Sequence, residues 1–290
     1  MNKGLNRFIP YMLIFPSVVL FVLFILLPIV WVLYLSFTDY TMLNAPEWVG
    51  FKNFERLWRD EIFHRAVKNT ALYWIGTVIP SMVIGLILAN LLALRLRGLA
   101  LFRAFLYLPG VISSVAVAMT WLWLFDPRQG PINGFLKLIG LEGRNWLQDP
   151  KTSLSSVILI GIWVGIGYAM IIFLSGIQSI SESLYEAASL DGASGLRKFW
   201  HITIPLLKPM TLFLFITATI RSFQVFDLVF VLTGGGPANS STTVVTQIVG
   251  ASFQEYKMGY ASAMAVFLLA ATFVVTVIQY AVGSRNASAE

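Results

Sequence analysis

The sequence predicts an all-α membrane protein with six transmembrane helices. Hydrophobic residues make up 57% of the 290 residues and charged residues only 12%, about half of the charged share in an average soluble domain. Apolar runs of roughly 20 residues, long enough to cross about 30 Å of hydrocarbon, occur six times. A water-soluble domain of this composition would expose large apolar patches. This excludes most classes of soluble enzyme and of nucleic-acid-binding protein.

Six apolar runs define the predicted spans. They cover residues 10–38, 72–94, 104–125, 154–178, 210–232 and 259–283. Only the fifth run contains charged residues, Arg221 and Asp227. The first run follows Lys3 and Arg7, as in a signal peptide, but it is too long and lacks a clear cleavage site of small residues. We therefore predict that the first run is retained as a span.

The basic residues predict the orientation of the chain in the membrane. Arg95, Arg97 and Arg103 occur without an acidic residue in the short connection after the second run. Further basic residues lie in the connection 179–209 and at both ends of the chain, where Arg285 is one of them. Because short loops rich in Lys and Arg stay in the cytoplasm, both termini and the loops after spans two and four are predicted to be cytoplasmic.

The connections on the outer side are too short for a separate soluble domain. Residues 39–68 mix charges of both signs with aromatic residues, which suggests a cover at the membrane interface. Within residues 131–147, apolar residues recur every three or four positions from Ile132 to Ile139, which predicts a short amphipathic helix in the membrane plane. Residues 234–237 are glycine-rich but no basic residue follows them, so a turn is predicted rather than a phosphate cradle.

The connection 179–209 is the most informative part of the sequence. A serine precedes a glutamate by three residues twice, at Ser179 and at Ser183. Either serine could cap the start of a helix. Asp191 and Gly192 predict the end of that helix, because glycine readily adopts the left-handed cap conformation.

A second short helix is predicted over residues 196–202, ending before Pro205 and Pro209. Two short helices joined by a turn would form a hairpin on the cytoplasmic face. The same pattern also fits an amphipathic connector that lies on the lipid head groups. The residue pattern alone leaves both interpretations open.

The spacing within this connection resembles the EAA loop of permease subunits of binding-protein-dependent ABC importers. The matching residues are Glu186, Ala187, Ala188, Asp191, Gly192, Ala193, Phe199, Ile202, Ile204 and Pro205. Ile204 stands where the family form has leucine. Residues 126–133 and 232–237 resemble the carbohydrate-uptake branch, the maltose and glycerol-3-phosphate type, so the similarity extends over nearly the whole chain.

The resemblance implies a single ABC importer transmembrane domain over residues 1–290, multi-pass in the cytoplasmic membrane of a bacterium or archaeon. It implies that the loop between spans four and five enters a cleft on a cytoplasmic ATP-binding subunit, whose closure switches the spans from inward- to outward-facing. The residues expected to couple the two subunits are Glu186, Ala187, Ala188, Asp191, Gly192, Ile202 and Pro205. The other implied partners are a sister permease in a heterodimer, an extracytoplasmic solute-binding protein, a carbohydrate and membrane lipid, with no nucleic acid.

The chain is expected to be a transport subunit and not an enzyme. It contains no G-x-x-x-x-G-K-[ST] motif, so it is not expected to cradle ATP by that device. The resemblance implies that ATP and Mg²⁺ are bound by the partner ATPase. No catalytic residue, metal site or cofactor is expected in this chain.

Polar residues inside a span are costly in lipid, so those of the fifth span are candidates for a substrate site. Arg221, Gln224 and Val225 are expected to share one helical face with Leu228, and Ser222 adds a hydroxyl group. Arg221 could equally be structural, bonded to a carbonyl oxygen or to an acid of a partner.

The family adds two residues of the fourth span to these candidates. In the similar maltose-type permease, the positions of Gly165 and Tyr168 face the sugar, and both residues match this chain. The positions of Arg221, Ser222 and Val225 also face the sugar there, but the residues differ, which implies a substrate other than maltose. A cation at position 221 would also fit an acidic sugar or a phosphorylated polyol.

A carbohydrate ABC importer permease is therefore the leading hypothesis, with glycerol-3-phosphate or another polyol or acidic sugar as the alternative substrate. An ion-coupled secondary transporter is the alternative from another class, although Asp227 is the only acidic residue within a span. An intramembrane enzyme is disfavoured, because the only histidines, His64 and His201, lie near or in loops and no H-E-x-x-H or G-x-S-x-G motif occurs.

Overall fold

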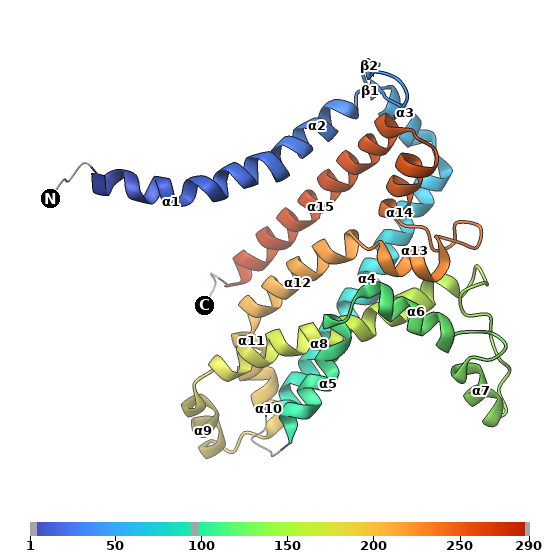
Figure 1. Cartoon of the computed structure of the whole chain (residues 1–290). Coiled ribbons are helices and arrows are strands. Elements are labelled where there is room, and N and C mark those ends of the chain that lie inside the picture. Colours follow the sequence, from blue (N-terminus) through green and yellow to red (C-terminus); the bar gives the residue numbers. More distant parts are fainter. Residues whose placement is uncertain (1–4, 94–97, 288–290) are drawn as a thin grey trace. The chain divides into compact units, whose positions relative to one another are not determined.

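The computed structural model (Figure 1) describes residues 5–93 and 98–287, and of residues 5–10 and 285–287 it describes the backbone alone. Lys3, Arg95 and Arg97, which entered the prediction of orientation, lie outside the described residues, as do the side chains of Arg7 and Arg285. The described chain is helical apart from loops and one pair of two-residue antiparallel strands, β1 (Thr38–Asp39) and β2 (Glu47–Trp48). An all-α fold is confirmed.

Four to six spans are present by length and composition within the described residues. Four helices are long and apolar enough to cross a membrane: Tyr11–Leu35, Glu61–Leu92, Ser153–Ser179 and Met258–Ser284. Two further spans result if each of two bent helix pairs counts as one: Leu99–Val111 with Ser114–Leu124, and Gly195–Leu206 with Lys208–Phe223. The structure is therefore compatible with the six predicted spans, although two of them are broken.

The chain divides into two compact units, the first formed by residues 1–60 and 247–269 and the second by residues 61–246 and 270–290. The first unit begins with one long helix, described as α1 (Leu5–Phe21), the π-helical segment η1 (Val22–Leu26) and α2 (Leu27–Leu35). The strand pair and α3 (Lys52–Arg59) follow. Rings of Phe37, Trp48, Phe51 and Phe54 pack on one another beside the strands.

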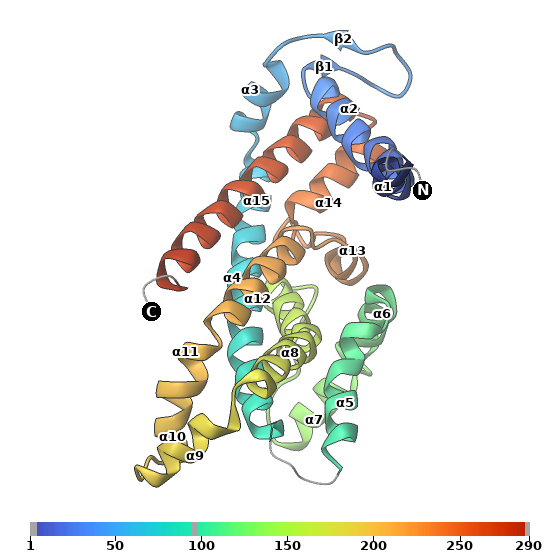
Figure 2. The ribbon, with the colours of Figure 1, turned by 90° about the vertical axis from the view of Figure 1, so that its left-hand side faces the viewer.

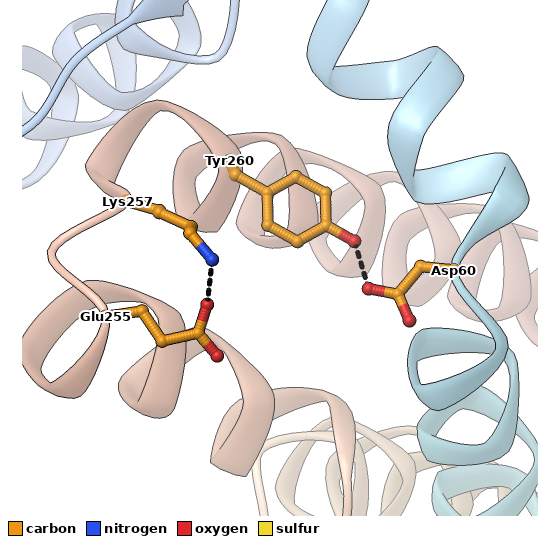
Figure 3. Close-up of polar contacts among 4 residues, drawn as sticks. All are labelled: Asp60, Glu255, Lys257 and Tyr260. Carbon is orange, nitrogen blue, oxygen red and sulfur yellow. Dashed lines mark hydrogen bonds and ion pairs between the residues drawn. The ribbon is translucent and has the colours of Figure 1, made fainter.

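Polar contacts hold the rest of the first unit together (Figure 3). The hydroxyl of Tyr260, in the first turns of α15 (Met258–Ala287), donates a hydrogen bond of 2.6 Å to a carboxylate oxygen of Asp60, just after α3. The guanidinium of Arg56 lies over the Tyr260 ring, 4.3 Å from its centroid. Lys257 and Glu255 form an exposed ion pair at 2.5 Å between the π-helical segment η3 (Gly250–Gln254) and α15.

The second unit is built on two long helices, α4 (Glu61–Leu92) and α8 (Ser153–Ser179), which pack against each other (Figures 1 and 2). Four more helices pack within this unit: α5 (Leu99–Val111) lies on α8, α12 (Lys208–Phe223) lies on α4, and α13 (Asp227–Thr233) lies on α6 (Ser114–Leu124). The sixth predicted span corresponds to α15, which begins one residue before Gly259.

The buried side chains of the second unit form two separate clusters along α8. One lies around Val157 and Ile160 in the first half of the helix, together with residues of α6 and α13. The other lies around Met170 and Phe173 in the second half, together with residues of α4 and α12. Gly165, Ile166 and Gly167, at the middle of α8, belong to neither cluster.

The third predicted span, 104–125, is not one straight helix. Helix α5 begins five residues before the predicted start, and the chain bends by 98° between α5 and α6. Ile112, at the break, is extended, with φ −69° and ψ 148°. Pro109 lacks a backbone N–H and Gly110 has low helix propensity, so the last turn of α5 is weak where the chain turns.

The fifth predicted span, 210–232, is also interrupted. Helix α12 ends at Phe223, and α13 starts at Asp227 after a non-helical Phe226 with φ −134°. The break leaves the carbonyl of Val225 outside both helices, and the hydroxyl of Thr243 donates a 3.2 Å hydrogen bond to it. The carboxylate of Asp227 in the first turn of α13 is favoured there by the helix dipole. The prediction of one helical face through residues 221–228 is therefore wrong.

The motif residues 126–133 shape the loop that follows α6. Backbone N–H groups of Arg128 and Gln129 donate to the Asp126 carboxylate, which lowers the pKa of Asp126 below its usual value. Asn133, on α7 (Pro131–Leu138), receives hydrogen bonds at its Oδ1 from Arg144 N and Trp146 Nε1. The predicted amphipathic helix is thus present, ends one residue earlier than expected, and is fixed to its loop by one buried amide.

Candidate substrate cavity and helical hairpin

A cavity of about 290 Å³ lies at the level of the gap between the two apolar clusters. Its lining on α8 runs from Gly161 to Ala169, and α8 itself spans residues 153–179. The lining therefore falls around the midpoint of a membrane-length helix. Helices α4, α5 and α12 supply most of the remaining wall.

The α4 wall carries hydroxyl groups at a spacing of four residues. Tyr73, Thr77 and Ser81 all line the cavity and are buried. Thr77 Oγ1 donates to the carbonyl of Tyr73 at 2.6 Å, and Ser81 Oγ donates across to the carbonyl of Ile162 on α8 at 3.3 Å. Because these two hydroxyl protons are engaged by the backbone, the oxygens present lone pairs to the cavity.

The α8 wall is made of small residues opposite these hydroxyls. A methyl group added to Gly165 would lie 2.8 Å from Ser81 Oγ, and one added to Gly161 would lie 2.6 Å from the hydroxyl of Tyr73. Both distances are shorter than van der Waals contact. The Gly161-x-x-x-Gly165 pattern thus allows α4 and α8 to approach closely where the cavity is formed.

Arg221 and Tyr168 both line the cavity and are in contact with each other. The guanidinium carbon of Arg221, on α12, lies over the Tyr168 ring of α8 at 4.3 Å from its centroid. This is a cation–π contact. Among the described residues that line the cavity, Arg221 is the only charged one. Ser222 lines the cavity as well, and its hydroxyl donates to the carbonyl of Thr219 at 2.9 Å.

Four of the six predicted substrate residues therefore lie together: Gly165, Tyr168, Arg221 and Ser222. The other two do not, because α12 ends before them. Gln224 is exposed and outside the lining, and Val225 is buried in the apolar cluster around α13. Asp227 is exposed on α13 and also outside the lining.

The sequence interpretation missed the α4 wall and Tyr107 of α5, which also lines the cavity. The signal for the α4 wall was present, since Tyr73, Thr77 and Ser81 recur every four residues on one face of an otherwise apolar helix. Nothing in the local sequence around Tyr107 distinguishes it from the other aromatic residues of its span.

The connection 179–209 forms a helical hairpin at one end of the second unit (Figure 2). Its first arm is α9 (Glu182–Leu190). Its second arm is continuous through α10 (Gly195–Lys198), the π-helical segment η2 (Phe199–Thr203) and α11 (Ile204–Leu206). The hydroxyls of Tyr185 and Thr203 share a 2.9 Å hydrogen bond between the arms, and Lys198 Nζ donates to Ser189 Oγ at 2.6 Å.

Two local predictions for the hairpin are wrong. The N-cap position of α9 is held by Ser181, because Ser179 still belongs to α8 and Ser183 already lies inside α9. The second arm continues through Pro205 to Leu206. Pro205 stands in the first turn of α11, where a missing N–H is tolerated, and the wider π-helical turn precedes it.

The turn of the hairpin agrees with prediction. Gly192 has φ +74°, in the left-handed region, and follows the C-cap residue Asp191. The backbone N–H of Ala193 donates to the carbonyl of Ala188 at 2.8 Å.

The predicted coupling residues occupy both arms of the hairpin. Glu186, Ala187, Asp191 and Gly192 are exposed, and Ala188, Ile202 and Pro205 are half-buried. Leu190 is 90% exposed and Leu196 70%, so apolar side chains flank the turn.

Within the described residues, no group of three or more His, Cys, Asp or Glu side chains is suitably placed to hold a metal ion.

The chain is similar to known transport proteins over nearly its whole length. Residues 70–288 match the family described as binding-protein-dependent transport system inner membrane component. The sn-glycerol-3-phosphate transport system permease protein UgpA of Agrobacterium fabrum is 32% identical over 279 residues, covering 95% of this chain and 94% of UgpA. The sulfoquinovosyl glycerol transport system permease protein SmoG of the same organism is 33% identical over 275 residues, covering 94% and 89%.

Solved structures share the fold. Two crystal structures of a bacterial ABC transporter match with a TM-score of 0.87 and 25% identity, each covering 98% of this chain and 98% or 96% of the matched chain. One is described as involved in import of the acidic polysaccharide alginate, and the other is in complex with an alginate pentasaccharide-bound periplasmic protein. This chain therefore belongs to the family of inner-membrane components of binding-protein-dependent transport systems, the permease subunits of ABC importers.

Proposed function

We propose that this chain forms, with a sister permease, the path by which a carbohydrate or polyol derivative delivered by a solute-binding protein crosses the cytoplasmic membrane. The cavity at the middle of α4 and α8 is the observation that carries the proposal. It combines hydroxyl groups from Thr77, Ser81 and Ser222 with the phenol rings of Tyr73 and Tyr107. Such a lining suits a ligand with many hydroxyl groups and some apolar surface.

The relatives support this substrate class. UgpA and SmoG are named for sn-glycerol-3-phosphate and sulfoquinovosyl glycerol, and the solved transporter imports alginate. Each is a sugar or polyol derivative that carries an acidic group. The periplasmic protein in the alginate complex supports a solute-binding partner for this chain as well.

Helices α9 to α11 form the proposed contact with a cytoplasmic ATP-binding subunit. Exposed apolar residues at a turn, here Leu190 and Leu196, are typical of a docking surface. The carboxylates of Glu186 and Asp191 add polar contacts beside them. ATP and Mg²⁺ would bind to the partner, whose closure would move the hairpin and with it α8 and α12.

The proposed topology has six spans, with the third formed by α5 and α6 and the fifth by α12, and with the hairpin and both termini in the cytoplasm. Residues 1–290 would then form one transmembrane domain. The Lys and Arg residues of the short connections after spans two and four support this orientation.

Uptake into proteoliposomes tests the function. The chain, its sister permease and the ATPase are purified together and supplied with the binding protein and radiolabelled sugars. Uptake should require ATP and the binding protein and should be insensitive to an uncoupler. Uptake that proceeds without ATP and collapses with the uncoupler would instead indicate an ion-coupled secondary transporter.

A further inference from the structure

We infer that the cavity selects sugar or polyol derivatives that carry an acidic group, and that the guanidinium of Arg221, held on the ring of Tyr168, binds this group. The inference rests on the proposed function, because it specifies the substrate class for the same cavity. Charge, geometry and the direction of the hydroxyl groups each support it.

The charge of the cavity is unbalanced. Arg221 contributes a permanent positive charge, and the described lining contains neither Asp nor Glu. Arg221 is exposed in this chain and so accessible to a ligand, but a guanidinium enclosed at the middle of a membrane protein is costly unless an opposite charge or hydrogen-bond acceptors accompany it. The Tyr168 ring supplies only part of this compensation. An oxyanion on the substrate would supply the rest.

The geometry leaves the guanidinium able to bind an oxyanion. The Tyr168 ring contacts one side of the group through its central carbon at 4.3 Å. The N–H groups on the outer edge remain available, and their fork matches the paired oxygens of a carboxylate, phosphate or sulfonate. Stacking also restricts the rotation of the Arg221 side chain, so less conformational entropy is lost when the anion binds.

The same contact disfavours a neutral sugar. A neutral sugar stacks its apolar face on the face of an aromatic ring, but the guanidinium of Arg221 already covers one face of the Tyr168 ring. On the α4 wall, Thr77 and Ser81 present lone pairs, because both hydroxyls donate to carbonyl groups. Lone pairs accept hydrogen bonds from substrate hydroxyls and repel an anion. The acidic group is therefore directed toward Arg221 and the polyol part toward α4.

Equilibrium binding to the complete complex tests the inference. The complex of both permeases and the ATPase is placed in nanodiscs without the binding protein, so that only the membrane cavity selects the ligand. Two pairs of radiolabelled probes are compared: digalacturonate with its methyl diester, and glycerol 3-phosphate with glycerol. Within each pair the acidic probe should bind more tightly to the wild-type complex by about tenfold or more.

Variants assign the difference to Arg221. Arg221→Gln should weaken binding of the acidic probes by about 10- to 100-fold and should not weaken binding of the neutral probes. Arg221→Lys keeps the charge but lacks the fork, so a loss of about tenfold is expected. Arg128→Gln removes the same charge from an exposed outer-loop position and should change neither probe. Size-exclusion chromatography checks that each complex remains assembled.

Three results would overturn the inference. One is equal binding of acidic and neutral probes to the wild-type complex, and another is binding of neither acidic probe. The third is an equal loss of both kinds of probe in Arg221→Gln and Arg221→Lys, which would make Arg221 a structural residue. If any of these three results is found together with ATP-dependent uptake of a neutral sugar, the inference is rejected and the proposed function is retained. ATP-independent uptake would reject the proposed function itself.

Discussion

The helical hairpin and the mid-span cavity are built in opposite ways. The hairpin uses one continuous stretch, residues 181–206, and most of its side chains are exposed or half-buried. The cavity collects residues from five helices between Tyr73 and Leu228, and its α4 wall is buried. Local backbone preferences therefore determine the hairpin, whereas helix packing determines the cavity.

This contrast predicts which substitutions each region tolerates. Nothing lies within 4 Å of a methyl group placed on Gly192, so the hairpin turn has room for a side chain but demands a left-handed backbone. Gly165 has an ordinary helical backbone but no room beside Ser81. Substitutions in the hairpin turn should therefore act through backbone conformation, and substitutions in the cavity wall through side-chain volume.

The largest effect is expected from Gly165→Val. Its side chain would force α4 and α8 apart and enter the cavity, and overpacking of this kind costs about 1–3 kcal/mol. We expect uptake into proteoliposomes to fall by about 100-fold, because the same residue both packs the helices and shapes the binding site. Gly134→Val, on α7 where nothing lies within 4 Å, is the matched control and should transport normally. Normal uptake by Gly165→Val would show that the cavity is not the path.

A smaller effect is expected from Gly192→Val. A β-branched residue at φ +74° is strained by about 1–2 kcal/mol, which should distort the turn without unfolding the buried helices. Uptake and ATP hydrolysis should become uncoupled, with uptake reduced by roughly tenfold. Gly192→Asn adds similar bulk but tolerates the left-handed region, so it should retain most uptake. Equal losses in both variants would mean that bulk, and not backbone conformation, matters at this turn.

The hairpin was largely predictable because its signals are local. Asp191 and Gly192 predicted the turn, and the spacing of residues 186–205 identified the family. The errors concern boundaries. The predicted serine caps are wrong because α8 includes Ser179 and α9 already includes Ser183. Pro205 does not end the second arm because it lies in a first turn after a π-helical segment.

The cavity was only partly predictable. Gly165 and Tyr168 came from the family resemblance, and Arg221 from its cost in lipid. The break after Phe223 could not be predicted, because the carbonyl group of Val225 receives its hydrogen bond from the hydroxyl of Thr243, which is distant in the sequence. The stacking of Arg221 on Tyr168 likewise depends on how α12 and α8 meet, which no local pattern encodes.

The smallest effect is expected within the hairpin, from Tyr185→Phe. The substitution removes the hydrogen bond to the buried Thr203 of the other arm, and one such bond contributes about 0.5–1.5 kcal/mol. Amide hydrogen exchange in α9 should rise by roughly 2- to 10-fold, while uptake should change by less than about twofold. Tyr280→Phe, on an exposed ring of α15, should change neither. Unchanged exchange in Tyr185→Phe would show that the backbone turn alone holds the two arms together. Local backbone preferences would then determine the hairpin without any contribution from side-chain contacts between its arms.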